Sequence, residues 1–346
     1  MDKILVIRLS SLGDVLLTTP AIRALARRFP FAKIDFLTKA RFAPLLDQNP
    51  YISRILRVEK GNLPELLSLR NTIRKEYDLV VDLHRNLRSF VLTPFFGGPA
   101  VTRVKKYALR RMLFVRFKIN LLKNIPSVPE RALSALLPLG VQDDGQGLDF
   151  FSGQSAVIQA KNLLHKFRLQ EKEPIALAPG SRWLTKRWPL KNFVDLILLL
   201  PHHRFVVMGE TQEKALGEEL KKAAPDRISN LIGETDLPTT GEILRRCRGL
   251  VTNDSGLMHL GCAVKIPVVA LFGSTQREFG FSPFRGRSLV LERTLACRPC
   301  TAIGRDICKT GSLECLATIS AKEVAEALEK VDVNLNREAA GFKAMV

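Results

Sequence analysis

The chain has 346 residues, of which 46% are hydrophobic and 25% are charged, and its formal net charge at pH 7 is +19. This composition is that of a folded globular protein, and it excludes an intrinsically disordered, collagen-like or disulfide-scaffold chain. The length suits two domains of roughly 150 to 170 residues each.

After Met1-Asp2-Lys3, the chain carries only four apolar residues before Arg8, too few for the core of a signal peptide. The longest apolar stretches are also far shorter than the roughly 18 residues that a membrane-spanning helix needs. Six cysteines in a chain without a secretion signal indicate a reducing compartment. We therefore expect a cytoplasmic protein.

Positive charge is concentrated in the first half of the chain. Residues 1–170 hold 28 Lys and Arg against 13 Asp and Glu, whereas the remainder holds 25 against 21. Such a field favours an anionic partner: nucleic acid, an acidic lipid surface or a phosphorylated acceptor. Charge alone leaves these three open.

Short apolar runs, typical of buried parallel strands, alternate along the chain with stretches of helical period. In the first half, strands are predicted at residues 4–9, 34–37 and 79–83, and helices at 15–29 and 42–47. Residues 142–155 are rich in Gly and Asp and indicate a linker. The alternation resumes with strands at 175–178, 205–208, 250–252 and 268–272, and helices near 190–200, 213–222 and 321–330. This predicts two doubly wound α/β domains, residues 1–150 and 151–346.

Ligands of open α/β sheets bind beyond the carboxyl ends of the strands, so the loops that follow predicted strands are the candidate sites. The first loop is R-L-S-S-L-G-D at residues 8–14, where the small residues Ser10 and Gly13 let a ligand approach the backbone. Asp14 lies where the strand passes into a helix. It is either a helix N-cap or a general base.

Three further loops carry polar groups suited to a nucleotide. In A-P-G-S-R-W-L-T-K-R-W-P (178–189), Lys186 and Arg187 either neutralise phosphates or belong to a solvated turn. In T-N-D-S-G-L-M-H (252–259), a helix start offers free amides to phosphate, although Asp254 or Ser255 could be a plain cap and His259 a core histidine. The acids of M-G-E-T-Q-E (208–213) suit ribose hydroxyls or an ordinary first helical turn.

Together these motifs resemble the ADP-heptose:lipopolysaccharide heptosyltransferases of glycosyltransferase family 9, heptosyltransferase II in particular. I-L-V-I-R-L-S-S-L-G-D-V-L-L-T-T-P-A-I-R-A-L is similar to that family's N-terminal signature, P-G-S-R-W-L-T-K-R-W-P to its phosphate loop, and D-S-G-L-M-H to its D-[S/T]-G-x-x-H element. The resemblance implies the GT-B architecture, in which two Rossmann-like domains face each other across a cleft. Residues 1–150 would bind the acceptor, and residues 151–346, with a C-terminal helix, the nucleotide-sugar donor.

The resemblance also implies an activity: inverting transfer of heptose from ADP-heptose to the inner core of lipopolysaccharide, on an acceptor built on lipid A. Asp14 corresponds to the proposed catalytic base and Lys186 to the lysine that neutralises the diphosphate. No cofactor or metal is expected, since no D-x-D motif is present. The ribose-binding acid is Glu210 or Glu213, with Glu213 preferred. The substrate-binding candidates are Ser10, Gly13, Ser181, Arg187, Glu213, Asp254, Ser255, Gly256 and His259.

Two alternatives remain at this point. The chain could be a glycosyltransferase that uses another nucleotide sugar. It could also be a non-enzymatic nucleic-acid binder, because its pI is near 10.0. No recognised nucleic-acid module is present, so no nucleic-acid partner is expected, and no G-x-G-x-x-G follows a strand to indicate a dehydrogenase.

A basic segment at residues 103–118 interleaves cations with apolar side chains. It predicts peripheral contact with the inner face of the inner membrane or with acceptor phosphates, against the alternative of an ordinary solvated helix face. Its cations are Arg103, Lys105, Lys106, Arg110, Arg111, Arg116 and Lys118.

Four of the six cysteines are clustered as Cys297-x2-Cys300-x7-Cys308-x6-Cys315. This spacing could hold a structural zinc, and free thiols or disulfides are the alternatives. The other two cysteines lie in apolar helical contexts and are predicted to be core residues.

Overall fold

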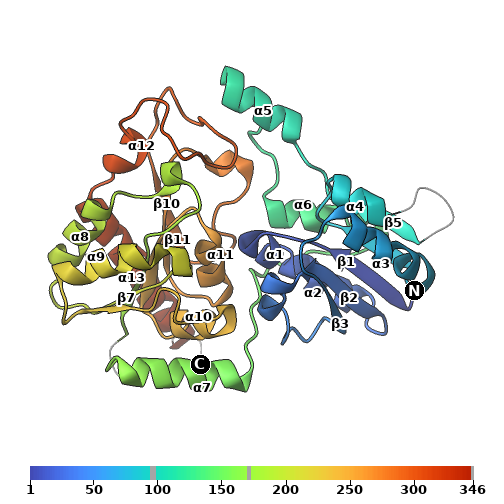
Figure 1. The fold of residues 1–346 in the computed structure, drawn as a ribbon, viewed down its shortest axis with the longest axis horizontal. Helices are drawn as coiled ribbons and strands as arrows, with labels where there is room; N and C mark the ends of the chain where they lie inside the picture. The colour runs from blue at the N-terminus through green and yellow to red at the C-terminus, as the bar shows by residue number, and fades with distance from the viewer. Residues whose placement is uncertain (94–98, 170–172, 344–346) are drawn as a thin grey trace. The chain divides into compact units, whose positions relative to one another are not determined.

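The computed structural model describes residues 1–93, 99–169 and 173–343 (Figure 1). The chain forms two compact units: Met1–Ala108 with Pro126–Ser152, and Leu109–Ile125 with Gly153–Val346. Chain order predicts that residues 109–125 belong to the first domain, whereas their contacts lie in the second unit. Because this excursion leaves the first unit and returns to it, a single boundary near residue 150 does not describe the division.

The sheet of the first unit has five parallel strands in the order β3-β2-β1-β4-β5. Its central strands are apolar because both faces are covered: Leu5 and Ile7 of β1 and Val80 of β4 lie in one buried cluster with Leu66 and Ile73 of α3. The strands are β1 (Lys3–Ile7), β2 (Lys33–Lys39), β3 (Arg54–Val58), β4 (Leu79–Asp82) and β5 (Ala100–Arg103). The helices are α1 (Leu12–Leu16), α2 (Thr19–Arg28), α3 (Leu63–Glu76), α4 (Leu87–Leu92) and α6 (Val128–Ser134), with 3₁₀ turns η1 (Ala40–Leu45) and η2 (Leu137–Leu139).

The predicted helix 15–29 is in fact two helices, α1 and α2. Pro20 lies in the first turn of α2, where its missing N–H costs nothing, so the helix restarts before it. At the break, the hydroxyls of Thr18 and Thr19 donate to the carbonyls of Val15 and Leu16, and the backbone N–H of Thr18 also donates to the carbonyl of Val15. The stretch predicted as helical at 42–47 is a 3₁₀ turn that contains Pro44.

The second unit repeats the design with six parallel strands in the order β11-β10-β9-β6-β7-β8. Figure 1 shows the strands of each unit flanked by helices. The strands are β6 (Ile175–Ala178), β7 (Phe205–Val207), β8 (Ile228–Asn230), β9 (Gly249–Asn253), β10 (Val268–Phe272) and β11 (Ser288–Glu292). The helices are α5 (Ala108–Phe117), α7 (Gln154–Lys166), α8 (Leu190–Leu199), α9 (Lys214–Ala223), α10 (Leu237–Leu244), α11 (Gly256–Ala263), α12 (Glu314–Ala317) and α13 (Ala321–Lys343), with 3₁₀ turns η3 (Leu184–Lys186), η4 (Thr211–Glu213) and η5 (Arg277–Phe279).

Trp188 anchors the core of the second unit. Its ring is 2% exposed and packs edge-on against Phe193 at 4.7 Å between centroids. Its indole N–H donates to the carbonyl of Ile319 at 2.9 Å, so the buried polar atom is satisfied. Trp188 thereby fixes the end of the loop that follows β6, residues 179–188, which we call the cation-rich loop.

Both sheets have the strand order of a dinucleotide-binding fold, and each therefore has one point at which the order reverses. In the first unit this point lies between β1 and β4, and in the second between β6 and β9. Among the residues described, no helix is long and apolar enough to cross a bilayer.

Candidate functional site

The predicted site residues follow the strands at the two reversal points. Ser10, Gly13 and Asp14 come after β1 in the first unit. In the second unit, the loop after β6 carries Ser181, Lys186 and Arg187, and the turn after β9 carries Asp254, Ser255, Gly256 and His259. Glu213 follows β7, the neighbour of β6. Each group of residues thus lies beyond the carboxyl ends of the strands of its sheet, where α/β sheets of this kind bind ligands.

An ion pair joins the loops after β6 and β9. The Lys186 ammonium lies 2.6 Å from Asp254 Oδ2, and both side chains are largely buried, at 13% and 9% exposure. Thr275, beyond β10, donates its hydroxyl to the same carboxylate oxygen at 2.7 Å. Asp254 therefore orients Lys186, and the structure places a fixed cation at the carboxyl edge of the second sheet.

Asn253 holds the cation-rich loop in shape. Its amide donates to the carbonyls of Pro179 and Gly180 at 2.8 and 3.2 Å, and its Oδ1 accepts from the backbone N–H of Trp188 at 2.9 Å. Across the same loop, Arg187 Nε donates to the carbonyl of Ser181 at 2.6 Å. Loop 179–188 is thus bonded at both ends to one side chain, which excludes a loosely solvated turn.

The turn after β9 leads into α11, whose N-cap is Ser255 and whose first residue is Gly256. The first amides of a helix have no intrahelical partner and attract anions. The Ser255 hydroxyl contacts Thr252 Oγ1 at 3.3 Å, and His259, one turn into the helix, is 4% exposed. Asp254 is not the cap, because its carboxylate holds Lys186 and Thr275.

Glu213, rather than Glu210, is directed toward the loop after β6. A Cβ added to Gly180 would collide with the Glu213 carboxylate, so only glycine permits this approach. The Glu213 carboxylate accepts the backbone N–H of Glu210 at 3.0 Å. Burial raises the pKa of Glu213, while that hydrogen bond and the charge of Arg187 oppose the rise. The exposed Glu210 side chain hydrogen-bonds Gln212.

In the first unit, Asp14 occupies the third position of α1, and the N-cap is Ser11. Asp14 Oδ2 accepts from the backbone N–H and the hydroxyl of Ser11, at 3.0 and 2.8 Å. Its other oxygen is ion-paired with Arg8, whose side chain also donates to the carbonyls of Ser10 and Leu83. The alternative of a simple N-cap is therefore wrong: Asp14 completes a capping box and keeps a 19% exposed carboxylate beyond β1.

Gly13 is buried within α1, where its carbonyl accepts from Leu17 at 2.9 Å. It is part of the helix that presents Asp14. Ser10 is half-buried, and its carbonyl accepts from Arg8 Nε at 3.1 Å. Both residues shape the backbone around Asp14.

Sequence analysis did not identify Arg8 and His84 as site residues. His84 follows β4, across the reversal point from the loop of Asp14, and is 9% exposed. Burial, followed by the charges of Arg8 and Lys106, lowers its pKa to about 3, so the imidazole is neutral at physiological pH. Asn86 contacts its Nε2 at 2.7 Å, and within the described part of the chain its Nδ1 has no hydrogen-bond partner. His84 could have been found in the sequence from the motif D-L-H-R-N, which begins at the end of the predicted strand 79–83.

The basic segment 103–118 does not form one continuous face. Arg103 belongs to β5, donates to Thr93 Oγ1 at 2.6 Å and lies over the ring of Phe90. At the other end, Lys118 donates to the carbonyls of Cys297 and Pro299 in the second unit. Between them, α5 exposes apolar side chains as well as cations: Leu109 at 66%, Met112 at 52% and Phe117 at 60%.

Known proteins provide an independent comparison. The sequence matches the profile of glycosyltransferase family 9 (heptosyltransferase) over residues 66–308. Lipopolysaccharide heptosyltransferase 2 of Escherichia coli K12 is 29% identical over 80% of this chain and 84% of its own. The solved structure of E. coli ADP-heptose lps heptosyltransferase II has a TM-score of 0.72 and 25% identity, covering 96% of this chain and 99% of that one.

A family 9 glycosyl transferase from Veillonella parvula has the same fold, with a TM-score of 0.79 and 23% identity over 96% of this chain and 97% of its own. The expected GT-B fold of two doubly wound α/β domains is thus confirmed. The chain is a glycosyltransferase, and it belongs to glycosyltransferase family 9, the heptosyltransferases.

Proposed function

We propose that the chain transfers heptose from ADP-heptose to the inner core of lipopolysaccharide, with inversion at the anomeric carbon. The observation that carries this proposal is the buried Lys186–Asp254 pair beside the start of α11, at the reversal point of the second sheet. The similar E. coli proteins are a lipopolysaccharide heptosyltransferase and an ADP-heptose heptosyltransferase, which supports both substrates.

On the donor side, Lys186 and the first amides of α11 meet the charge of the diphosphate. This charge grows as the nucleotide departs, so fixed donors stabilise the transition state more than the bound donor. Ser181, Arg187, Asp254, Ser255, Gly256 and His259 shape this site. Glu213, directed at Gly180, accepts hydrogen bonds from the ribose hydroxyls.

On the acceptor side, Asp14 removes the proton from the attacking hydroxyl, which approaches the anomeric carbon from the face opposite the diphosphate. An ionised carboxylate accepts this proton, and the ion pair with Arg8 fixes its direction. Ser10, half-buried, lies beside this carboxylate in the chain, and the buried Gly13 belongs to the helical turn that carries it. The cations Arg8, Arg88 and Lys106, whose charges act on His84, favour an anionic acceptor such as a lipid A and inner-core saccharide.

We also propose that the protein is cytoplasmic and touches the inner face of the inner membrane through α5. An interfacial helix presents apolar side chains together with cations, and α5 exposes Leu109, Met112 and Phe117 beside Arg110 and Arg116. The acceptor is itself anchored in that surface by its lipid.

A donor screen tests the proposed reaction. ADP-heptose, UDP-sugars and GDP-sugars are each incubated with lipopolysaccharide truncated in its inner core, and the products are weighed by mass spectrometry. We expect transfer from ADP-heptose alone, and NMR of the product should show an inverted anomeric centre. Transfer from a UDP- or GDP-sugar in preference to ADP-heptose would contradict the proposal.

A further inference from the structure

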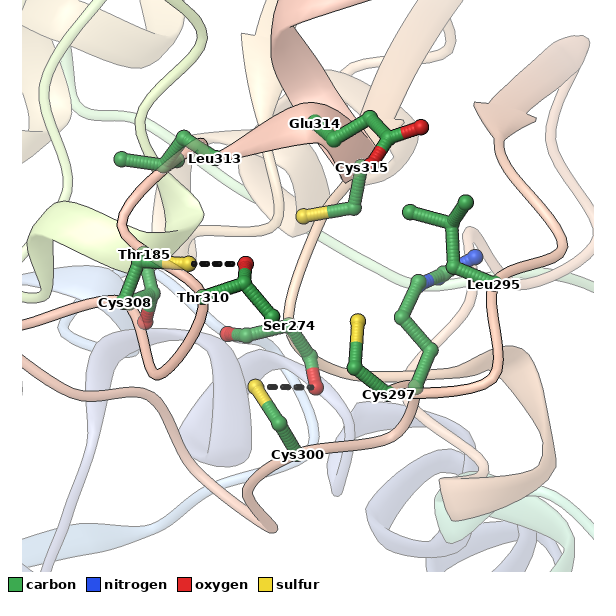
Figure 2. Close-up of a pocket in the computed structure, with 11 residues that line it drawn as sticks. Thr185, Ser274, Leu295, Cys297, Cys300, Cys308, Thr310, Leu313, Glu314 and Cys315 are labelled. Carbon is green, nitrogen blue, oxygen red and sulfur yellow. Dashed lines mark hydrogen bonds between the residues drawn. The ribbon is translucent and has the colours of Figure 1, made fainter.

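The cysteine loop, defined here as residues 293–313, connects β11 to α12 without a regular helix or strand. Three of its residues, Cys297, Cys300 and Cys308, line one small cavity together with Cys315 of α12. Figure 2 shows the four sulfur atoms turned toward the interior of this cavity, three from different parts of the loop and one from α12. All four are free thiols.

Ordinary packing does not account for four thiols around one space. Cys300 Sγ lies 3.9 Å from the carbonyl of Ser274, and Cys308 Sγ lies 3.3 Å from Thr310 Oγ1. Thiols are weak donors and weak acceptors, so these contacts contribute little. An irregular segment of this length inside a compact unit needs another source of order, and a bound metal ion is a common one.

The surroundings of the cavity suit a negatively charged centre. A divalent cation with four thiolates carries a net charge of −2. The Lys118 ammonium lies beside the cluster, where it donates to the carbonyls of Cys297 and Pro299 at 2.8 and 2.6 Å. Arg298, 5% exposed, also lines the cavity, but its guanidinium is ion-paired with Glu292 at 2.9 Å, and the lining includes the acid Glu314. Lys118 therefore offsets part of that charge.

We propose that Cys297, Cys300, Cys308 and Cys315 bind one thiophilic divalent cation, Zn²⁺ or Fe²⁺, in a tetrahedral tetrathiolate site. Cys-x2-Cys followed by two further cysteines is the ligand pattern of such sites, and four sulfurs select soft cations over Mg²⁺ or Ca²⁺. Binding forms four metal–sulfur bonds and releases four protons. No group of three or more His, Cys, Asp or Glu side chains within the described residues is arranged to hold a metal as it stands. The thiols must therefore close inward as the ion binds, which the irregular loop permits.

The metal would stabilise the loop that carries Lys186, through contacts between that loop and the cysteine loop. Thr185, next to Lys186, exchanges three hydrogen bonds with the backbone of Arg305 in the cysteine loop, at 2.9 to 3.0 Å. The backbone N–H of Cys300 donates to the carbonyl of Ser274, the neighbour of the residue that holds Asp254. Loss of the ion should therefore loosen the Lys186 loop. This consequence rests on the proposed function, whereas metal binding itself does not.

The test begins with metal analysis of the whole chain, purified anaerobically and reconstituted with Zn²⁺ or Fe²⁺. We expect about one ion per chain by mass spectrometry of the metal. Cobalt substitution should give the thiolate-to-metal charge-transfer bands and the intense visible bands of tetrahedral Co²⁺. Cys300→Ser and Cys308→Ser should reduce the bound metal to below about a tenth. Cys247→Ala and Cys262→Ala, which alter buried thiols outside the cavity, should retain it.

Cobalt binding to the unaltered chain keeps the test valid if a serine variant fails to fold. A reconstituted chain without metal and without the cobalt spectrum would overturn the proposal, as would equal metal loss in the Cys247→Ala control. An intact mass lower by about 2 Da per bridge under native conditions would instead identify disulfides. ADP affinity, measured with and without the ion, tests the support of Lys186 separately.

Discussion

At Asp14, one carboxylate closes the first turn of α1 and, as we propose, accepts the proton of the acceptor hydroxyl. Asn retains an oxygen that can accept from Ser11, but it cannot take up a proton. We expect Asp14→Asn to lower kcat by about 100-fold or more while ADP affinity is unchanged. Steady-state kinetics and ADP titration check this.

The matched control for Asp14→Asn is Arg8→Met, because Asn also weakens the ion pair with Arg8. Arg8→Met breaks the same pair and keeps the base. If the pair were the whole contribution of Asp14, both variants would lose activity equally. Full turnover by Asp14→Asn would refute the assignment of the base.

Lys186 provides the second prediction. Its removal leaves the diphosphate with one cation fewer and Asp254 without its ion partner. Lys186→Ala should raise the KM for the donor and lower kcat, a loss of about 2 to 4 kcal/mol in transition-state stabilisation. Lys191→Ala is the control, because that lysine is 83% exposed and pairs with Asp195 one turn away on the surface of the same helix. Equal kinetics for the two variants would mean that Lys186 does not bind the donor.

His84 should make the unfolding free energy depend on pH. Its pKa in the folded chain is about 3, below the ordinary value of 6.5, so the unfolded chain binds one more proton between these values. The resulting stabilisation is complete above pH 6.5 and falls on acidification toward pH 3, by at most about 1.4 kcal/mol per pH unit. Urea titrations from pH 7 to 4 should show a shallower slope for His84→Gln. An unchanged slope would show that His84 does not titrate as proposed.

Among the elements, the segment predicted as a linker is firmly tied to the first unit. Arg23 of α2 is 2% exposed and is ion-paired with Asp144 and Asp149. The Arg23 hydrogen bond is the main cause that lowers the pKa of Asp144 to about 2. The aspartates that indicate a flexible linker in the sequence are therefore the acceptors for a buried guanidinium.

Arg23→Met should lower the free energy of unfolding by about 3 to 5 kcal/mol, because two carboxylates lose the partner that compensates their burial. Arg27→Met is the comparison, since Arg27 is 50% exposed and pairs with the same Asp144. It should cost no more than about 1 kcal/mol. If both variants had similar midpoints in urea denaturation, the burial of Arg23 would not explain the contribution of its ion pairs to stability.

Whether a strand could be predicted from the sequence depends on its position in the sheet. All seven predicted strands are present, with bounds that differ by no more than a few residues. The missed strands are β3, β5, β8 and β11, which are the edges of the two sheets. Edge strands are covered less completely: β3 contains two arginines, and β11 is half-buried throughout. β3, β5 and β8 carry no run of three apolar residues, whereas β11 carries L-V-L at residues 289–291 and was missed although it has one. Only the structure reveals the pairing of these strands.

A similar limit applies to the candidate site. The loops after β1, β6 and β9 could be located because they follow strong strands. The choice between Glu210 and Glu213 could not, because it depends on a 3₁₀ turn that directs only Glu213 at Gly180. The ion pair of Arg8 with Asp14 also depends on how the chain turns between them, which spacing does not specify.

The basic segment 103–118, which includes α5, gives a prediction about membranes. Reversing Arg110 and Arg116 of α5 together with Lys105 and Lys106 just before it, all exposed, should weaken binding to anionic liposomes at least about tenfold. The control reverses Lys161, Lys166, Lys221 and Lys330, which are equally exposed and change the net charge by the same amount. Equal weakening would mean that the liposomes respond to total charge. Unchanged binding of the variant reversed at residues 105, 106, 110 and 116 would exclude the basic segment as the contact.

In the whole molecule, the distribution of charge between the two compact units differs from its distribution along the chain. The first unit holds 20 Lys and Arg against 13 Asp and Glu, and the second holds 33 against 21. Five of the cations in the second unit come from residues 109–125, a stretch without acids. The positive excess of the first half of the chain is therefore partly carried by the second unit, which contains Lys186 and Asp254. Chain position alone could not show this.

The excursion of residues 109–125 makes the chain pass between its two units three times. In the second unit, Phe114 packs edge-on against Phe279, and Lys118 bonds to the cysteine loop, 179 residues further along the chain. A chimera that exchanged residues 1–152 for those of a relative would bring a foreign helix to both contacts. Exchange of the first unit thus requires a discontinuous replacement, in which residues 109–125 stay with the cysteine loop of the recipient.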